Sequence, residues 1–214
     1  MSFKELTTAP ATEPITLAEV KAHGRIDTSA DDLYITELII AVRQMFETET
    51  RRALINQSWT LWYDAPPIRC GITGQWWDGV REGARVETVI NHLDLRPTQL
   101  SSITQVNSYG TDNVATVFAS TNYFLDKVSN PARLVLNQGS TWPTSLRPAN
   151  ALSVEVVSGY GANPSDVPAE IRHILKAAVL NWYSSRGDCA SQKQIDAANR
   201  FIKPMIQKYR DVRL

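Results

Sequence analysis

The chain has 214 residues, and its 43% hydrophobic content is enough for a core that buries roughly 70% of the unfolded surface. Lys plus Arg and Asp plus Glu number 22 each, so the formal net charge is zero and no overall basic field indicates a nucleic-acid-binding protein. No apolar run approaches the roughly 20 residues that span a bilayer, which argues against a membrane protein.

The first predicted helix covers about residues 17–23 and carries a signal at each end. Thr16 is suited to cap the N-terminus, and Glu19 stands three residues later, where it completes a capping box. Gly24 follows the helix, and glycine is favoured where a helix stops because it adopts left-handed backbone angles without strain. These signals predict a short helix with defined ends.

A second helix is predicted to begin after Ser29. Asp31 and Asp32 stand in its first turn, where the helix dipole favours negative charge. Apolar residues then recur every three or four positions, which is the spacing of one buried helix face. The predicted buried face consists of Ile35, Leu38, Ile39, Val42, Met45 and Phe46.

The pattern changes from helical to strand-like at Leu54. From there to Tyr63, apolar and polar residues alternate, as in a strand that packs one of its faces. Residues 64–85 are predicted to form a long irregular insert, because glycines and prolines recur in it. Residues 110–113, Gly-Thr-Asp-Asn, predict a hairpin turn between two strands. Further strands are predicted at residues 86–95, 101–109, 114–120, 123–127, 132–136 and 151–158.

The helical spacing returns after Pro168, which suits the first turn of a helix. This third helix is predicted to run to about Arg186, with Gly187 as its stop. A last helix is predicted to start near Ser191, and Pro204 should kink or restart it because proline has no backbone N–H to donate. The apolar faces consist of Ile171, Ile174, Leu175, Ala178, Val179 and Trp182 in the third helix and of Ile195, Ala198, Ile202, Met205, Ile206 and Tyr209 in the last.

This order of elements predicts an α+β fold. Two N-terminal and two C-terminal helices are expected to form a four-helix bundle, into which a mainly antiparallel β-domain is inserted. Residues 1–53 and 161–214 are assigned to the bundle and residues 54–160 to the β-domain. Residues 64–85 are assigned to a long loop of that domain.

The sequence contains no recognisable catalytic or metal-binding motif. His23, His92 and His173 are far apart in sequence and lack metal-ligand spacing, as do the two cysteines. Asp31 and Asp32 could imitate a paired-carboxylate site, but helix N-termini attract acidic residues for electrostatic reasons alone. A hydrolase with a Ser-His-Asp site assembled from distant residues stays as a remote alternative without a supporting motif. We therefore predict a protein that is not an enzyme and uses no cofactor or metal.

Trp76 and Trp77 lie next to each other in the predicted insert. Large aromatic residues on a loop often anchor an interface and supply much of its binding energy. The pair could equally fold back over the sheet, or form a platform on which a sugar stacks. Trp76 and Trp77 are therefore candidates for a subunit or partner interface, and a carbohydrate- or receptor-binding module is the alternative function.

Several short segments, taken in order along the chain, carry a resemblance to a known family. They are residues 14–23 (PITLAEVKAH), 25–27 (RID), 52–61 (RALINQSWTL), 159–161 (GYG), 167–172 (VPAEIR), 181–183 (NWY) and 208–210 (KYR), together with Leu214. In these segments the chain resembles the head-to-tail connector, or adaptor, proteins of long-tailed bacteriophages, the neck adaptors of gene-transfer agents included. The insert at residues 64–85 departs from the shorter connection expected of the family.

The resemblance implies a structural virion protein that is assembled in the cytoplasm of a bacterial host and located in the virion neck. Such a connector forms a ring, expected to hold twelve copies, that binds the portal protein and offers a surface to a stopper or tail terminator protein. The ring extends the DNA channel, and the genome passes through it without sequence-specific binding; no membrane takes part. In such connectors the C-terminal tail reaches the portal, which assigns portal binding to Tyr209, Arg210, Val212, Arg213 and Leu214.

Overall fold

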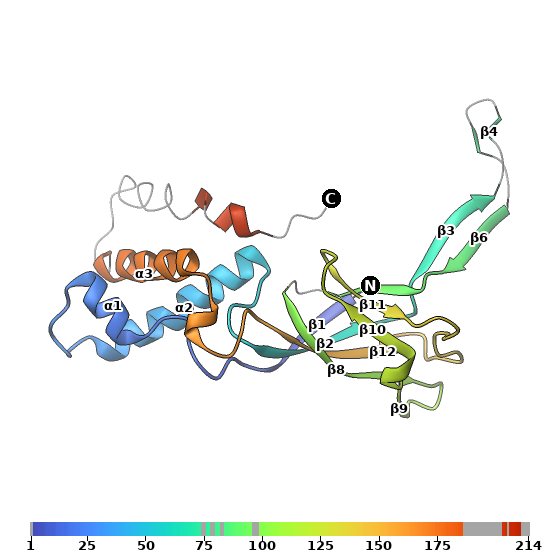
Figure 1. Ribbon diagram of the computed structural model, residues 1–214, viewed down its shortest axis with the longest axis horizontal. Coiled ribbons are helices and arrows are strands. Elements are labelled where there is room, and N and C mark those ends of the chain that lie inside the picture. Colours follow the sequence, from blue (N-terminus) through green and yellow to red (C-terminus); the bar gives the residue numbers. More distant parts are fainter. Residues whose placement is uncertain are drawn as a thin grey trace. The chain divides into compact units, whose positions relative to one another are not determined.

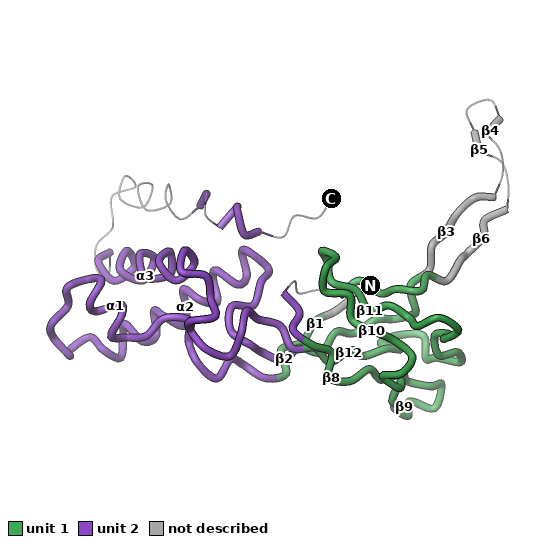
Figure 2. The backbone as a smooth tube through the Cα atoms, in the orientation of Figure 1, with its two compact units in different colours: residues 1–7, 59–96, 102–156 green, residues 8–58, 97–101, 157–214 purple. Residues whose placement is uncertain are grey.

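The chain folds into two compact units, one built mainly of strands and one built mainly of helices (Figure 2). The computed structural model describes residues 2–73, 76–77, 80–81, 84–95, 99–185, 203–204 and 206–210. Unit 1 comprises residues 1–7, 59–96 and 102–156, and unit 2 comprises residues 8–58, 97–101 and 157–214. None of the described helices is long and apolar enough to cross a membrane.

Three helices among the residues described before position 186 of unit 2 pack on one another (Figure 1). They are α1 (Leu17–Gly24), α2 (Asp32–Thr50) and α3 (Ala169–Ser184), and a 3₁₀ turn, η2 (Pro164–Asp166), precedes α3. The predicted capping box opens α1: the Thr16 hydroxyl accepts a hydrogen bond from the Glu19 backbone N–H at 3.2 Å, and the Glu19 carboxylate accepts one from the Thr16 N–H at 2.9 Å. The start of α1 is therefore confirmed.

The core of unit 2 contains most of the residues that the helical spacing predicts for α2 and α3, although Trp182 on α3 is only half-buried. It holds Ile15, Val20, Ile35, Leu38, Ile39, Val42, Phe46, Leu54, Ile55, Val167, Ile171, Ile174, Leu175, Ala178 and Val179, all buried. Met45, predicted for the same face, is only half-buried. Burying these side chains removes apolar surface from water, at about 25 cal/mol per Å², and this is the main force that holds the three helices together.

Two predicted helix ends differ from the structure. The left-handed residue after α1 is Arg25, with a φ of 52°, whereas Gly24 is still helical. Gly24 serves close packing instead, since a Cβ there would lie 2.5 Å from Leu180 Cδ2 on α3. Helix α2 begins at Asp32 with Asp31 as its N-cap, and the Asp31 side chain makes no capping bond.

Unit 1 is organised around two sheets of different size. The larger has the order β1 (Ser2–Thr8), β2 (Gln57–Tyr63), β12 (Leu152–Ser158), β8 (Leu100–Tyr109) and β9 (Ala115–Val117). The smaller has the antiparallel order β10 (Tyr123–Asp126), β11 (Ala132–Leu136) and β7 (His92–Leu95), and a 3₁₀ turn, η1 (Ser120–Asn122), precedes β10. The predicted turn at residues 110–113 joins β8 to its antiparallel neighbour β9 and is confirmed.

Residues 64–85 contain strands, so the prediction of an irregular insert is wrong. Strand β3 (Ile68–Thr73) pairs with β6 (Ala84–Val89), and β4 (Trp76–Trp77) pairs with β5 (Val80–Arg81), both antiparallel. Gly71 stands opposite Val86 in a ladder of six residue pairs between β3 and β6. The single strand predicted at residues 86–95 is divided between β6 and β7, and β1 was not predicted at all.

One hydrogen bond joins the larger sheet of unit 1 to the smaller one, and another joins two of its connecting segments. The Tyr63 hydroxyl on β2 donates to the Asp94 carbonyl on β7 at 2.9 Å, and the Trp142 indole N–H donates to the Ile90 carbonyl at 2.8 Å. The aliphatic residues of β12 and β11 alternate between buried and partly exposed positions, as expected for sheets that each pack one face.

The predicted α+β class with mainly antiparallel sheets is confirmed. Most of the predicted last helix lies outside the described residues, although residues 203–204 and 206–209 are helical. The four-helix bundle and the domain boundaries at residues 53 and 160 therefore stay predictions.

Candidate assembly site

The described end of the chain is attached to the first turn of α3 through one carboxylate. The Tyr209 hydroxyl donates a hydrogen bond to Glu170 Oε2 at 2.7 Å. The Lys208 ammonium lies 2.9 Å from Glu170 Oε1 and 2.8 Å from Oε2. We call Glu170, Lys208 and Tyr209 the C-terminal clasp.

The clasp combines an apolar contact with an exposed ion pair. Ile206 and Tyr209 pack against the helical core of unit 2, and both are half-buried. The Lys208 side chain is 61% exposed and that of Glu170 is 37% exposed, so water screens their attraction. The position of Glu170 in the first turn of α3 also favours its charged form, because an acidic residue there complements the helix dipole.

The same contacts shift the pKa values of Glu170 and Tyr209 in opposite directions. The hydrogen bond from Lys208, followed by the one from Tyr209, lowers the pKa of the Glu170 carboxyl. The hydrogen bond to Glu170 raises the pKa of Tyr209 to about 12, with burial as a second cause. At neutral pH Glu170 is therefore a carboxylate and Tyr209 a neutral phenol.

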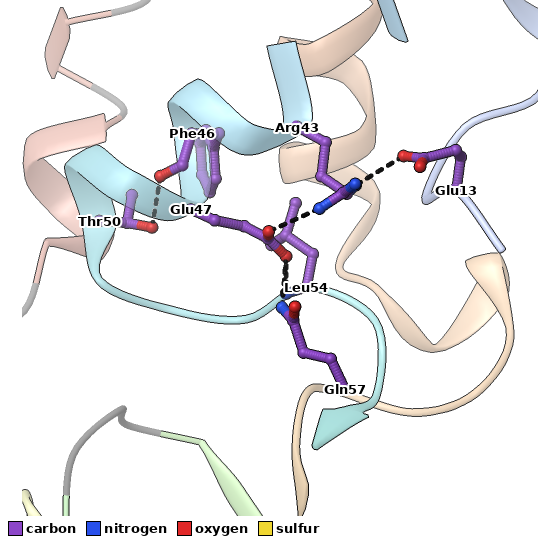
Figure 3. Close-up of polar contacts among 7 residues, drawn as sticks. All are labelled: Glu13, Arg43, Phe46, Glu47, Thr50, Leu54 and Gln57. Carbon is purple, nitrogen blue, oxygen red and sulfur yellow. Dashed lines mark hydrogen bonds and ion pairs between the residues drawn. The ribbon is translucent and has the colours of Figure 1, made fainter. Parts of the chain in front are cut away.

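A second polar cluster holds the segment that leads from α2 into β2 (Figure 3). Arg43 Nε donates to Glu13 Oε2 at 2.7 Å, and Arg43 Nη1 donates to Glu47 Oε2 at 2.8 Å. Glu47 Oε1 accepts from the Leu54 backbone N–H at 2.9 Å and from the Gln57 amide at 3.0 Å. Glu47 on α2 thus holds the connecting segment at Leu54 and at Gln57, the first residue of β2. We call Glu13, Arg43, Glu47, Leu54 and Gln57 the junction network.

Burial dominates the electrostatics of the junction network. The Arg43 side chain is 8% exposed and that of Glu47 is 14% exposed. Burial raises the pKa of Glu47, although the bonds from Leu54 and Arg43 act in the opposite direction. Burial acts to lower the pKa of Arg43, but the bond to Glu13 and the charges of both glutamates outweigh it, and this pKa is raised.

Two segments that carried the family resemblance cross each other close to this network. The Asn56 backbone N–H donates to the Gly161 carbonyl at 2.9 Å, and the Tyr160 N–H donates to the Leu54 carbonyl at 3.1 Å. The helix-to-strand junction and the return to helix are therefore joined directly. Residues 159–161 lie between β12 and η2.

The predicted portal-binding residues fall partly within the described chain. Tyr209 belongs to the clasp, and Arg210 is exposed, with its backbone N–H bonded to the Gln207 carbonyl at 3.3 Å. Val212, Arg213 and Leu214 lie outside the described residues. Sequence reasoning missed Glu170, because nothing in the chain signals a contact between residues 39 positions apart.

The predicted interface residues Trp76 and Trp77 form strand β4. Their backbone register is known: Trp76 stands opposite Arg81, and Trp77 stands opposite Val80. Their side chains are outside what the structure describes, so the choice among an interface, a cover for the sheet and a sugar platform stays open.

The histidines that look isolated in the sequence are not all isolated in the fold. The rings of His23 on α1 and His173 on α3 meet edge to face with centroids 5.3 Å apart. Among the described residues, no group of three or more His, Cys, Asp or Glu side chains is placed to hold a metal ion. This pair is a contact between two helices that the sequence spacing could not reveal.

The candidate carboxylate pair has structural partners. Asp31 Oδ2 accepts a hydrogen bond from the Tyr183 hydroxyl at 2.7 Å, and Asp32 Oδ1 lies 2.7 Å from the Lys21 ammonium. Asp31 and Asp32 stand at the N-terminus of α2 as predicted; the Asp31 side chain makes no capping bond and links the start of α2 to the end of α3. Both contacts hold helices of unit 2 together.

Comparisons with known proteins place this arrangement among phage and particle neck components. Residues 14–92 match the family described as phage gp6-like head-tail connector proteins, a family of structural proteins, so the predicted resemblance and the prediction of a non-enzymatic protein are confirmed. No protein of curated function matches the chain.

Solved structures of low sequence identity share the fold over nearly the whole chain. A chain of the structure described as "Neck of empty GTA particle computed with C6 symmetry" is 19% identical, with a TM-score of 0.72. A chain of "Virion of native gene transfer agent (GTA) particle" is 18% identical, with a TM-score of 0.70, and a chain of "Neck of native GTA particle computed with C12 symmetry" is 19% identical, with a TM-score of 0.64. In each case the match covers 99% of this chain and 97% of the other.

Proposed function

We propose that this chain is a head-tail connector: a structural virion protein that forms a ring between the portal and the next neck or tail protein. The observation that carries the proposal is the agreement of two comparisons. Residues 14–92 match a connector family, and the fold matches chains of particle necks over 99% of its length. The protein then belongs in the virion neck, and it is assembled in the cytoplasm of the bacterial host.

The ring is made of copies of this chain, and we expect twelve. The neck structures that share the fold were computed with C6 and C12 symmetry, which supports a repeated subunit. Repeated head-to-tail contacts close into a ring when the rotation between neighbours permits it. The ring extends the DNA channel, and a formal net charge of zero is consistent with a genome that passes through without sequence-specific binding.

The portal contact is assigned to the end of the chain: Tyr209, Arg210, Val212, Arg213 and Leu214. Arg210 is exposed and Tyr209 is half-buried on the surface of unit 2, which supports a segment that can be reached by another protein. Three of the residues from position 208 onward are basic, Lys208, Arg210 and Arg213, against one acidic residue, Asp211. A positive segment favours an acidic surface on the portal.

The remaining contacts are assigned to the other face of the ring and to its sides. A stopper or tail terminator protein binds the ring on the side away from the portal. Trp76 and Trp77 form strand β4, which pairs antiparallel with β5, and two neighbouring tryptophans on one short strand support a subunit or partner interface. Residues 1–53 and 161–214 form the helical bundle, in which the last helix packs as the fourth member.

Electron microscopy of portal assemblies mixed with the purified full chain tests the proposal. We expect ring density on the portal, and a chain that leaves the portal bare would contradict it. A variant that lacks residues 208–214 should lose the joining of heads to tails, whereas a variant with Glu37→Gln on the exposed face of α2 should not. Glycan binding that is lost on Trp76→Ala would instead support the carbohydrate-binding alternative.

A further inference from the structure

The residues proposed to bind the portal are partly occupied within the subunit itself. The Tyr209 hydroxyl and the Lys208 ammonium both bond the Glu170 carboxylate, at 2.7 Å and 2.8 Å. While these bonds exist, neither group can make the same bonds to another protein. The free subunit therefore holds its own portal-binding segment against α3.

The clasp is built to open without loss of the fold. Its polar part is an exposed carboxylate and an exposed ammonium, with side chains 37% and 61% accessible, and pairs of this kind contribute little to stability. Next to this ion pair, Tyr209 and its neighbour Ile206 pack at the edge of the helical core, and neither of them is fully buried. None of the three clasp residues belongs to the fully buried core of α1, α2 and α3, although Tyr209 packs against that core.

We propose that the C-terminal clasp is a releasable self-contact that competes with the portal for the segment that contains Tyr209 and Arg210. In the free subunit Glu170 retains Lys208 and Tyr209, and on the portal these residues leave Glu170. This regulation rests on the proposed function, because it requires the C-terminal segment to be the portal-binding segment. It assigns to Glu170 a role in controlling assembly without contact to the portal.

Chymotrypsin cleavage of the free, full-length protein tests whether the clasp closes. Cleavage after Tyr209 requires its side chain to enter the protease, which a closed clasp prevents. We expect Glu170→Gln and Tyr209→Phe each to speed cleavage at position 209 by about fivefold, because each removes a bond to a charged group while keeping an aromatic residue at position 209. Glu37→Gln, a matched change on α2, should leave the rate as in the wild type, and mass spectrometry identifies the cleaved bond.

Binding of the same proteins to isolated portal rings tests the competition. If the closed state masks the segment, opening it raises the binding-competent fraction, so Glu170→Gln should bind the portal several-fold more tightly. Unchanged cleavage in both clasp variants would overturn the proposal. Faster cleavage with equal or weaker portal binding by Glu170→Gln would also overturn it, because the clasp would then not compete.

A further variant separates this inference from the proposed function. A chain that lacks residues 208–214 and still binds the portal as the wild type does would overturn the portal-binding assignment, and the competition with it. The cleavage rates would in that case still decide whether Glu170 retains the segment. Weak portal binding by the truncated chain, together with tight binding by Glu170→Gln, supports both.

Discussion

Gly159 lies directly against the backbone of Asn56: a Cβ on Gly159 would stand 2.5 Å from the Asn56 nitrogen. The same Cβ would be 2.6 Å from the Ile55 carbonyl carbon, and Gly159 has a φ of 153°. Only a residue without a side chain fits where the strand-to-helix return crosses the start of β2. The contact explains the glycine that opens the Gly-Tyr-Gly segment.

Gly159→Ala should therefore lower the free energy of unfolding by about 2 kcal/mol or more, because backbone atoms would have to move apart. Urea unfolding followed by far-ultraviolet circular dichroism measures the change. Gly24→Ala is the matched control. Its Cβ would meet the flexible end of Leu180, and the gain in helix propensity of roughly 1 kcal/mol offsets part of the cost. Equal losses in the two variants would contradict this account.

Arg43→Gln should destabilise unit 2 by about 3 kcal/mol, because it leaves Glu47 with a buried and uncompensated charge. Burial already raises the pKa of Glu47, and loss of Arg43 removes one of the influences that oppose the rise. Stability of the variant should thus recover partly as the pH falls and Glu47 takes up a proton. Arg172→Gln is the control, since Arg172 lies 3.7 Å from Glu19 and is 27% exposed; a loss as large as that of Arg43→Gln would speak against the junction network.

Asp126→Asn should destabilise the hairpin formed by β10 and β11 at neutral pH. Hydrogen bonds from the Ser129 hydroxyl and from Arg133 lower the pKa of Asp126 well below its ordinary value of 3.8. A carboxyl group whose pKa is lowered in the folded state stabilises the protein at pH values above its ordinary pKa. This stabilisation is lost as the pH falls below that ordinary pKa. The difference in melting temperature between wild type and variant should therefore shrink in acid.

Asp94 on β7, the neighbour of Arg133 on the side away from Asp126, supplies the control for that experiment. Asp94 stands opposite Arg133 in the β11–β7 ladder, yet Arg133 bonds Asp126 at 2.7 Å. Asp94→Asn makes the same change in charge and should leave the melting temperature nearly unchanged. If the two variants melt alike at neutral pH, the bonds of Asp126 do not stabilise the hairpin.

Thr16→Ala should lower the free energy of unfolding by about 1 kcal/mol, the usual cost of losing an N-cap side chain. The Thr16 backbone bond is the main reason that the pKa of Glu19 is lowered, and the hydroxyl of Thr16 adds to it. Thr16→Ser keeps the hydroxyl and should stay close to the wild type in urea unfolding. A Ser variant as unstable as the Ala variant would mean that the methyl group of Thr16, not its hydroxyl, matters.

Local signals in the sequence predicted the helices of unit 2 well. A capping box and a repeat of three or four residues depend only on neighbours within one or two turns, so Thr16, Glu19 and the buried face of α2 could be recognised. The insert at residues 64–85 could not, because a strand is defined by its partner. Gly71 suggests a loop until its place in the ladder between β3 and β6 is known.

The candidate site was predicted only at the level of the segment. Family resemblance pointed to Tyr209 and Arg210, but the partner that retains Tyr209 is Glu170, and a contact of that range leaves no periodic mark. The same applies to His23 and His173, which meet only because α1 packs on α3. Such pairs follow from tertiary packing, which single-sequence patterns do not encode.

The chain passes between its two units after residues 7, 58, 96, 101 and 156. Neither unit therefore corresponds to a continuous stretch of the gene. A single recombination crossover between residues 8 and 156 would combine parental sequences within both units at once, so that each hybrid core would hold residues that had not evolved together. Exchange between related genes should thus succeed mainly when the whole coding sequence is transferred.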